Sequence, residues 1–170
     1  MAVTSAKLRE FDERGVIMLE GLVSPRQLTA AAAAAAELTP QPENGGDHVR
    51  ADGSVDTGAR VGFGSRDGGI VAPALLDVAQ HVWLERIAQQ LLRTDDVSLF
   101  RSSVLSTYRD PPEDPPTEWS FHIDQQFGLR DWHAAPRRAQ VALWLFLSDV
   151  LEGQAPMMVC PGSHRAVAQL

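Results

Sequence analysis

Cysteine and lysine are almost absent from this chain of 170 residues: Cys160 is the only cysteine and Lys7 the only lysine. A single cysteine excludes an intrachain disulfide and gives no support to export into an oxidising compartment. No apolar run approaches the ~18 residues that a membrane-spanning helix needs, and the first residues lack the basic and apolar regions of a signal peptide. We therefore expect a cytoplasmic protein with no membrane partner.

Basic residues are in the minority, with 15 Lys and Arg against 22 Asp and Glu, so the formal net charge is -7. The arginines are scattered rather than clustered, which argues against a nucleic-acid partner. The chain also lacks a P-loop, a glycine-rich dinucleotide fingerprint, a Cys-x-x-Cys pair and a Gly-x-Ser-x-Gly motif. The length and the ordinary content of 44% hydrophobic residues predict one domain, residues 1–170, with a real core.

Helix signals dominate the first part of the chain. Thr4 or Ser5 can cap a short helix that ends at Gly15, and the β-branched, apolar residues 16–19 predict a short strand. The sequence Ser24-Pro25-Arg26-Gln27 is a strong helix start, and an alanine-rich run follows it. Because alanine offers little area to bury, we expect this helix to lie flat against a neighbour.

The remaining patterns predict a loop, one more helix and a series of strands. Residues 41–69 are rich in glycine and polar side chains and predict a long loop, with a short strand at 60–63. Apolar residues at spacings of three and four predict one amphipathic helix over 73–93. Strands are predicted over 98–108 and 157–160, and over 141–147, which is apolar at every position and so is expected to be buried on both faces. This order predicts helices in residues 1–97 and strands in 98–170, a mainly β or α+β fold with flanking helices.

The most informative stretch is Trp119-Ser120-Phe121-His122-Ile123-Asp124-Gln125. If it is extended, His122 and Asp124 share one face, whereas Phe121 and Ile123 point the other way into apolar packing. One imidazole and one carboxylate are two of the three protein ligands in the 2-His-1-carboxylate site of non-heme Fe(II) oxygenases. Taken alone the pattern is weak, and a strand with His and Asp on a solvated face is the alternative.

The wider order of motifs resembles the phytanoyl-CoA dioxygenase family of Fe(II)- and 2-oxoglutarate-dependent oxygenases. The His-x-Asp pair is followed by the apolar segment 141–150, by Glu152-Gly153 and then by Val159-Cys160-Pro161-Gly162-Ser163-His164-Arg165. Near the start stands the segment 11–19, Phe-Asp-Glu-Arg-Gly-Val-Ile-Met-Leu. The resemblance runs from about Leu8 to Arg165.

The resemblance implies a double-stranded β-helix, the jelly-roll barrel also seen in cupins. It implies a dioxygenase that uses Fe(II), 2-oxoglutarate and O2, with ascorbate as a candidate supporting reductant, to hydroxylate a small organic substrate. In the family, the distal histidine ligand and the arginine that binds 2-oxoglutarate lie well beyond the Pro-Gly-Ser-His segment. Because the sequence stops six residues after His164, we expect a barrel that is incomplete at its C-terminus.

The resemblance also implies roles for individual residues. His122 and Asp124 are the expected catalytic metal ligands, and Trp144 and Thr107 are the expected contacts to 2-oxoglutarate. That Trp144 only fills the core is an equally weighted alternative. Ser163 and His164 are expected to fix their own turn by hydrogen bonds rather than to bind metal, and Cys160 is expected to be a small buried residue.

A second function remains open beside the dioxygenase. Without the distal histidine and the arginine, the chain would be a catalytically inactive fragment or an interaction module. Unpaired strand edges would then favour self-association or pairing with a complementing chain.

Overall fold

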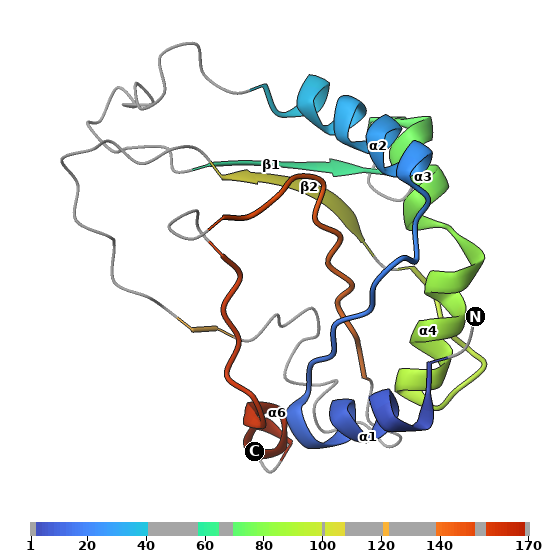
Figure 1. The fold of residues 1–170 in the computed structure, drawn as a ribbon, viewed down its shortest axis with the longest axis vertical. Helices are drawn as coiled ribbons and strands as arrows, with labels where there is room; N and C mark the ends of the chain where they lie inside the picture. The colour runs from blue at the N-terminus through green and yellow to red at the C-terminus, as the bar shows by residue number, and fades with distance from the viewer. Residues whose placement is uncertain are drawn as a thin grey trace, which may run out of the picture.

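The computed structural model of the protein describes residues 3–40, 58–64, 70–99, 101–107, 121–122, 139–151 and 156–168 (Figure 1). In these ranges, five helices and two strands follow one another in the order α1 (Ser5–Arg14), α2 (Pro25–Leu38), β1 (Gly58–Phe63), α3 (Pro73–Ala79), α4 (Val82–Leu92), β2 (Ser102–Thr107) and α6 (Ser163–Val167). None of the helices in the described part is long and apolar enough to cross a membrane.

The first two helices begin where the sequence predicts. Thr4 is the N-cap of α1, and its side chain accepts a hydrogen bond from the backbone of Lys7. Gly15 ends the same helix with a φ of 74° and donates its N–H to the carbonyl of Phe11. Ser24 and Gln27 form the complete capping box of α2, with Pro25 in the first turn. Both predicted helix starts are confirmed. Each depends on hydrogen bonds between residues that are close in the sequence.

Helix α2 lies flat against α3, as its alanines predict. Ala31 is fully buried (0% exposed) and Ala35 is buried as well, in one cluster with Leu75 and Val78 of α3 and Val104 of β2. An alanine buries less apolar surface than a larger side chain would. Small side chains let two helices pack closely, and this close packing offsets the smaller buried area.

The predicted helix over 73–93 is wrong in one respect, because the structure divides it into α3 and α4. The break falls at Gln80 and His81, and His81 caps α4 by accepting a hydrogen bond from the backbone N–H of Trp83. The physical reason lies in the packing. Helix α3 packs into the cluster with α2, whereas Ile87 and Leu91 of α4 form a second cluster with Val3. The break lets each helix turn its apolar side to a different cluster.

Strands β1 and β2 form a two-stranded antiparallel sheet, with Gly58 opposite Thr107 and Phe63 opposite Ser102. The predicted strands at 60–63 and 98–108 are therefore confirmed in the part that these elements cover. The short helix α6 follows directly after the segment 157–160, which was predicted to be a strand. In Figure 1, α2 and α3 lie over one end of this sheet, α1 and α6 lie at the opposite end of the molecule, and α4 runs along the side between α3 and α1.

Three further predicted strands, at 16–19, 141–147 and 157–160, are wrong: these residues are assigned to no strand in the structure. In the described part, β1 pairs with β2, and one isolated bridge joins Phe63 to Ile70. None of the three segments has such a partner, and a strand requires a partner for its backbone hydrogen bonds. The expected burial of 141–147 on both faces is also wrong, since residues 142–146 are exposed. Val141 contacts one apolar cluster and Leu147 the other, so the segment connects the two.

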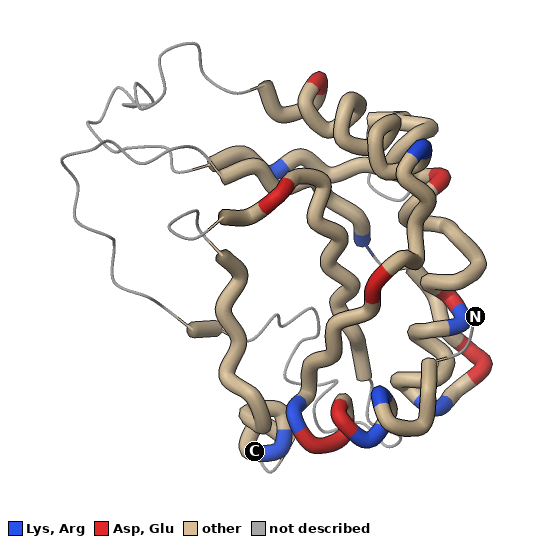
Figure 2. Tube along the Cα trace, in the orientation of Figure 1, with Lys and Arg blue, Asp and Glu red and all other residues tan. Residues whose placement is uncertain are grey.

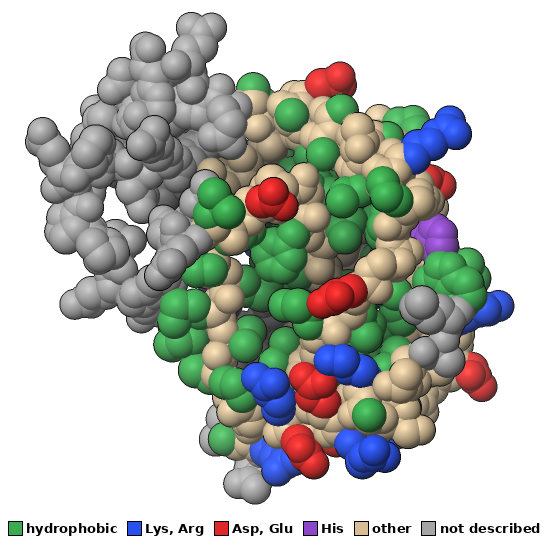
Figure 3. All heavy atoms as spheres, in the orientation of Figure 1, with side chains coloured by type: hydrophobic (Ala, Val, Ile, Leu, Met, Phe, Trp, Pro, Cys, Tyr) green, Lys and Arg blue, Asp and Glu red, His purple; other side chains and the backbone are tan. Residues whose placement is uncertain are grey.

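The architecture of the described residues is thus a mixture of helices with one small antiparallel sheet. It does not show a jelly-roll barrel. Figure 2 shows charged residues of both signs along α1, and Figure 3 shows apolar side chains gathered on the same face of the molecule above that helix. The exposed apolar residues of the described part include Leu143, Leu145, Phe146 and Met158.

Candidate functional site

His122, the first predicted metal ligand, lies in a two-residue described segment, 121–122, and its side chain is exposed. Neither residue of this segment is assigned to a helix or a strand. Phe121 was expected to point into apolar packing, but it is 57% exposed, so that expectation is wrong. The reason is the same as for the other missing strands, because no neighbouring strand in the described part covers this side chain.

Asp124, the second predicted ligand, lies outside the described residues, as does Ile123. The expected placement of His122 and Asp124 on one face therefore stays a prediction. Among the described residues, no group of three or more His, Cys, Asp or Glu side chains comes together as a metal-binding cluster. The fit to a metal rests on the donor types, since one imidazole and one carboxylate are the ligands that non-heme Fe(II) sites use.

The two predicted 2-oxoglutarate contacts come from different parts of the fold. Thr107 is the last residue of β2 and is exposed, opposite Gly58 of β1. Trp144 is 51% exposed within the apolar segment that connects the two clusters. The alternative that Trp144 only fills the core is therefore not what the structure shows, and its indole remains accessible to a ligand.

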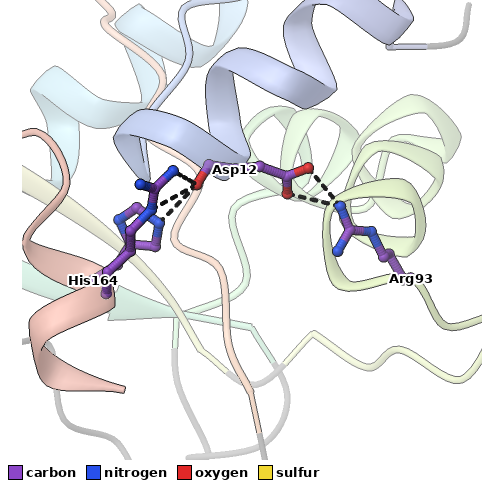
Figure 4. A network of polar contacts seen from close by, with 4 residues as sticks. Asp12, Arg93 and His164 are labelled. Carbon is purple, nitrogen blue, oxygen red and sulfur yellow. Dashed lines mark hydrogen bonds and ion pairs between the residues drawn. The ribbon is translucent and has the colours of Figure 1, made fainter. Parts of the chain in front are cut away.

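A polar network joins three segments that are far apart in the sequence, with Asp12 at its centre (Figure 4). The Nη2 atom of Arg93 lies 2.7 Å from Oδ1 and 2.6 Å from Oδ2 of Asp12. Arg93 is the C-cap of α4 and has a φ of 55°, which is rare for a residue other than glycine. Both side chains of this ion pair are exposed, so its direct contribution to stability is small.

The backbone carbonyl of Asp12 accepts the other contacts of the network. His164 Nε2 lies 3.2 Å from this oxygen, and Arg165 donates from Nε at 3.3 Å and from Nη2 at 3.0 Å. In addition, the N–H of Gly162 donates to the carbonyl of Arg14 at 2.8 Å. The Pro-Gly-Ser-His-Arg motif thus contacts the end of the Phe-Asp-Glu-Arg-Gly motif directly.

His164 was expected to stabilise its own turn, and the structure places its side chain on α1 instead. The turn itself is closed by the backbone, through a bond from Ser163 N–H to the carbonyl of Cys160. Cys160 is exposed, so the expectation that it is buried is wrong as well. Both differences arise because residues 156–160 lie at the surface rather than within a sheet.

Sequence reasoning did not find the role of Asp12 or of Arg93. A contact between residues 81 or more positions apart leaves no periodic pattern in a single sequence. For the other half of the network, the sequence offered only the two motifs themselves, Phe-Asp-Glu-Arg-Gly and Pro-Gly-Ser-His-Arg. The structure brings them together, because a Cβ atom on Gly15 would lie 2.8 Å from the His164 Cγ atom.

The chain matches a known family model along most of its length. The model described as phytanoyl-CoA dioxygenase matches residues 11–169, a range that includes the His-x-Asp pair and both motifs of the Asp12 network. No curated protein and no solved structure matches the chain.

Proposed function

The chain belongs to the phytanoyl-CoA dioxygenase family, and on that premise we propose that it is an Fe(II)- and 2-oxoglutarate-dependent dioxygenase that hydroxylates a small organic substrate. Membership implies oxygenase chemistry and a cupin-like fold at the level of the family. The observation that carries the proposal is that the matched range contains His122 and Asp124 in the His-x-Asp spacing.

We propose that His122 and Asp124 hold the iron as the catalytic ligands. The imidazole of His122 is exposed and can reach a metal without a large rearrangement of the core. Iron held by these two residues would supply the family's chemistry, in which oxidative decarboxylation of 2-oxoglutarate by O2 to succinate and CO2 is coupled to hydroxylation of the substrate. The carboxylate of Asp124 supplies a negative ligand beside the neutral imidazole, which is the donor set that suits Fe(II).

Two residues are proposed to position 2-oxoglutarate. The half-exposed indole of Trp144 offers an apolar face against which the carbon chain of the cosubstrate can pack. The hydroxyl of Thr107 can donate a hydrogen bond to a carboxylate oxygen. Both side chains are exposed in the structure.

The finer features of fold and location are proposals too. We propose that residues 1–170 form a single domain with the double-stranded β-helix of the family, and the antiparallel pairing of β1 with β2 is compatible with that barrel. The single cysteine supports a cytoplasmic location.

The proposal is tested by measuring succinate after incubation with Fe(II), 2-oxoglutarate, ascorbate and a panel of small organic substrates. We expect succinate from the full-length wild-type protein and a loss of at least tenfold in its His122→Ala variant. His48→Ala is the control, since His48 stands in the segment 41–69 that was predicted to be a loop and has no proposed role. It should retain the wild-type rate. Equal succinate from the wild type and from His122→Ala would refute the assignment of His122.

A non-catalytic interaction module is the second candidate, and the exposed apolar segment 142–146 favours it. Contiguous apolar side chains at a surface favour association with another surface. This candidate predicts self-association, or pairing with a complementing chain, and no succinate with any substrate. Sedimentation velocity over a range of concentrations separates the two behaviours, because self-association raises the sedimentation coefficient with concentration.

A further inference from the structure

Residues 156–168, here called the C-terminal strap, are held differently from the rest of the described structure. None of these residues is buried, and none belongs to either of the two apolar clusters. The strap nevertheless lies against α1, as Figure 1 shows for α6. Its docking therefore rests on polar contacts, as far as the described residues show.

The polar contacts of the strap satisfy backbone carbonyl groups at the C-terminal end of α1. The last carbonyls of a helix have no partner within the helix itself. The strap supplies donors to two of them, with Gly162 bonded to the carbonyl of Arg14, and with His164 and Arg165 both bonded to that of Asp12. Cationic or donor side chains at this end also complement the negative end of the helix dipole.

Gly15 makes room for the docked strap. Its φ of 74° ends α1, and the His164 ring occupies the space where a side chain at position 15 would begin. The end of α1 therefore accommodates the strap in two ways: its carbonyls accept hydrogen bonds from the strap, and Gly15 leaves space for the His164 ring.

We propose that the C-terminal strap is a detachable unit, which α1 holds through the carbonyls of Asp12 and Arg14 and which releases as a whole while α2 and α4 stay folded. Segments with few buried apolar contacts and exposed hydrogen bonds open at a lower free energy than the core. The strap meets both conditions, whereas α2 and α4 contribute buried residues to the two clusters.

Native-state hydrogen exchange tests the proposal in the complete chain. The N–H groups of Gly162, Arg165 and Ala168 donate hydrogen bonds in the docked strap. We expect these three amides to exchange with one common opening free energy, and at least about tenfold faster than the slowest amides of α2 and α4. A strap that exchanges as slowly as α2 would overturn the proposal.

Two variants identify what holds the strap. His164→Ala and Arg165→Ala each remove side-chain donors to the Asp12 carbonyl, and each should speed exchange of the Gly162 amide about fivefold. Amides of α2 that exchange by local fluctuation should not change, and those that exchange only on complete unfolding should speed up by no more than the same fivefold. If neither variant changes the Gly162 amide, the side-chain contacts do not hold the strap and the proposal fails.

Asp12→Asn is the matched control, because it removes the charge that pairs with Arg93 but keeps the backbone carbonyl that the strap uses. It should leave exchange of the Gly162 amide within about twofold of the wild type. If Asp12→Asn speeds exchange of the Gly162 amide as much as His164→Ala does, the backbone carbonyl of Asp12 is not what holds the strap.

Discussion

Gly15→Ala should destabilise the protein by more than the same change at Gly21, although both glycines have a positive φ. The φ values are 74° at Gly15 and 67° at Gly21, so alanine at either position pays a similar cost for a left-handed backbone, about 1 kcal/mol. The surroundings differ. A Cβ atom at Gly21 meets nothing within 4 Å, whereas at Gly15 it meets the His164 ring.

The larger loss of stability in Gly15→Ala follows from the hydrogen bond that the His164 ring loses. The added methyl group displaces the His164 ring, so the bond from Nε2 to the Asp12 carbonyl is lost, at about 1 kcal/mol. Gly15→Ala should therefore cost about 2 kcal/mol in total, against about 1 kcal/mol for Gly21→Ala. His164→Ala alone should cost about 1 kcal/mol, because it loses the same bond.

The double variant gives the sharpest test of this reasoning. If one bond is lost in both single variants, Gly15→Ala with His164→Ala should cost about 2 kcal/mol rather than the additive 3 kcal/mol, a coupling of about 1 kcal/mol. Urea unfolding followed by circular dichroism measures all four variants. Equal costs at Gly15 and Gly21, with strict additivity in the double variant, would refute the contact between Gly15 and His164.

Three further changes test the packing, capping and charge of the described helices. Ile87→Ala should lower the free energy of unfolding by about 2–5 kcal/mol, because Ile87 is only 2% exposed. Val82→Ala, at a position that is 48% exposed in the same helix, should lower it by less than about 1 kcal/mol. Thermal unfolding compares the two variants, and equal losses would contradict the assigned core. Ser24→Ala should cost about 1 kcal/mol through loss of the capping box of α2, with a lower midpoint in urea; an unchanged midpoint would show that this cap does not contribute. The hydrogen bond from Lys7 lowers the pKa of the Glu10 carboxyl below its ordinary value of 4.5, so the ionised carboxylate stabilises the fold at neutral pH and this contribution is lost as the pH falls below 4.5. The stability difference between wild type and Glu10→Gln should accordingly be larger at pH 7 than at pH 3, and a difference that grows toward pH 3 would reverse the sign of this argument.

Local signals in the sequence predicted the local parts of the fold. The caps at Thr4 and Ser24 and the helix end at Gly15 depend on residues within four positions of each other, and the structure has all three. The flat packing of α2 also followed from its alanines, since small side chains leave few other ways to pack. These features need no knowledge of the rest of the chain.

The predictions that were wrong concern contacts between distant segments. An apolar run such as 141–147 shows that burial is favourable, but a strand also requires a partner, and none pairs with it in the described part. The break at His81 depends on the existence of two apolar clusters, which a single helical stripe does not reveal. For the candidate site, the residue types and spacing of His122 and Asp124 carry the assignment, which stays a prediction.

The metal site is tested most directly by anaerobic calorimetric titration of the wild-type chain, His122→Ala and His48→Ala with Fe(II). We predict saturable binding to the wild type and to His48→Ala, and at least a tenfold loss of affinity in His122→Ala. Far-ultraviolet circular dichroism should be the same for all three chains, because His122 is exposed and belongs to neither apolar cluster. Fe(II) affinity that is unchanged in His122→Ala would contradict the proposed iron site.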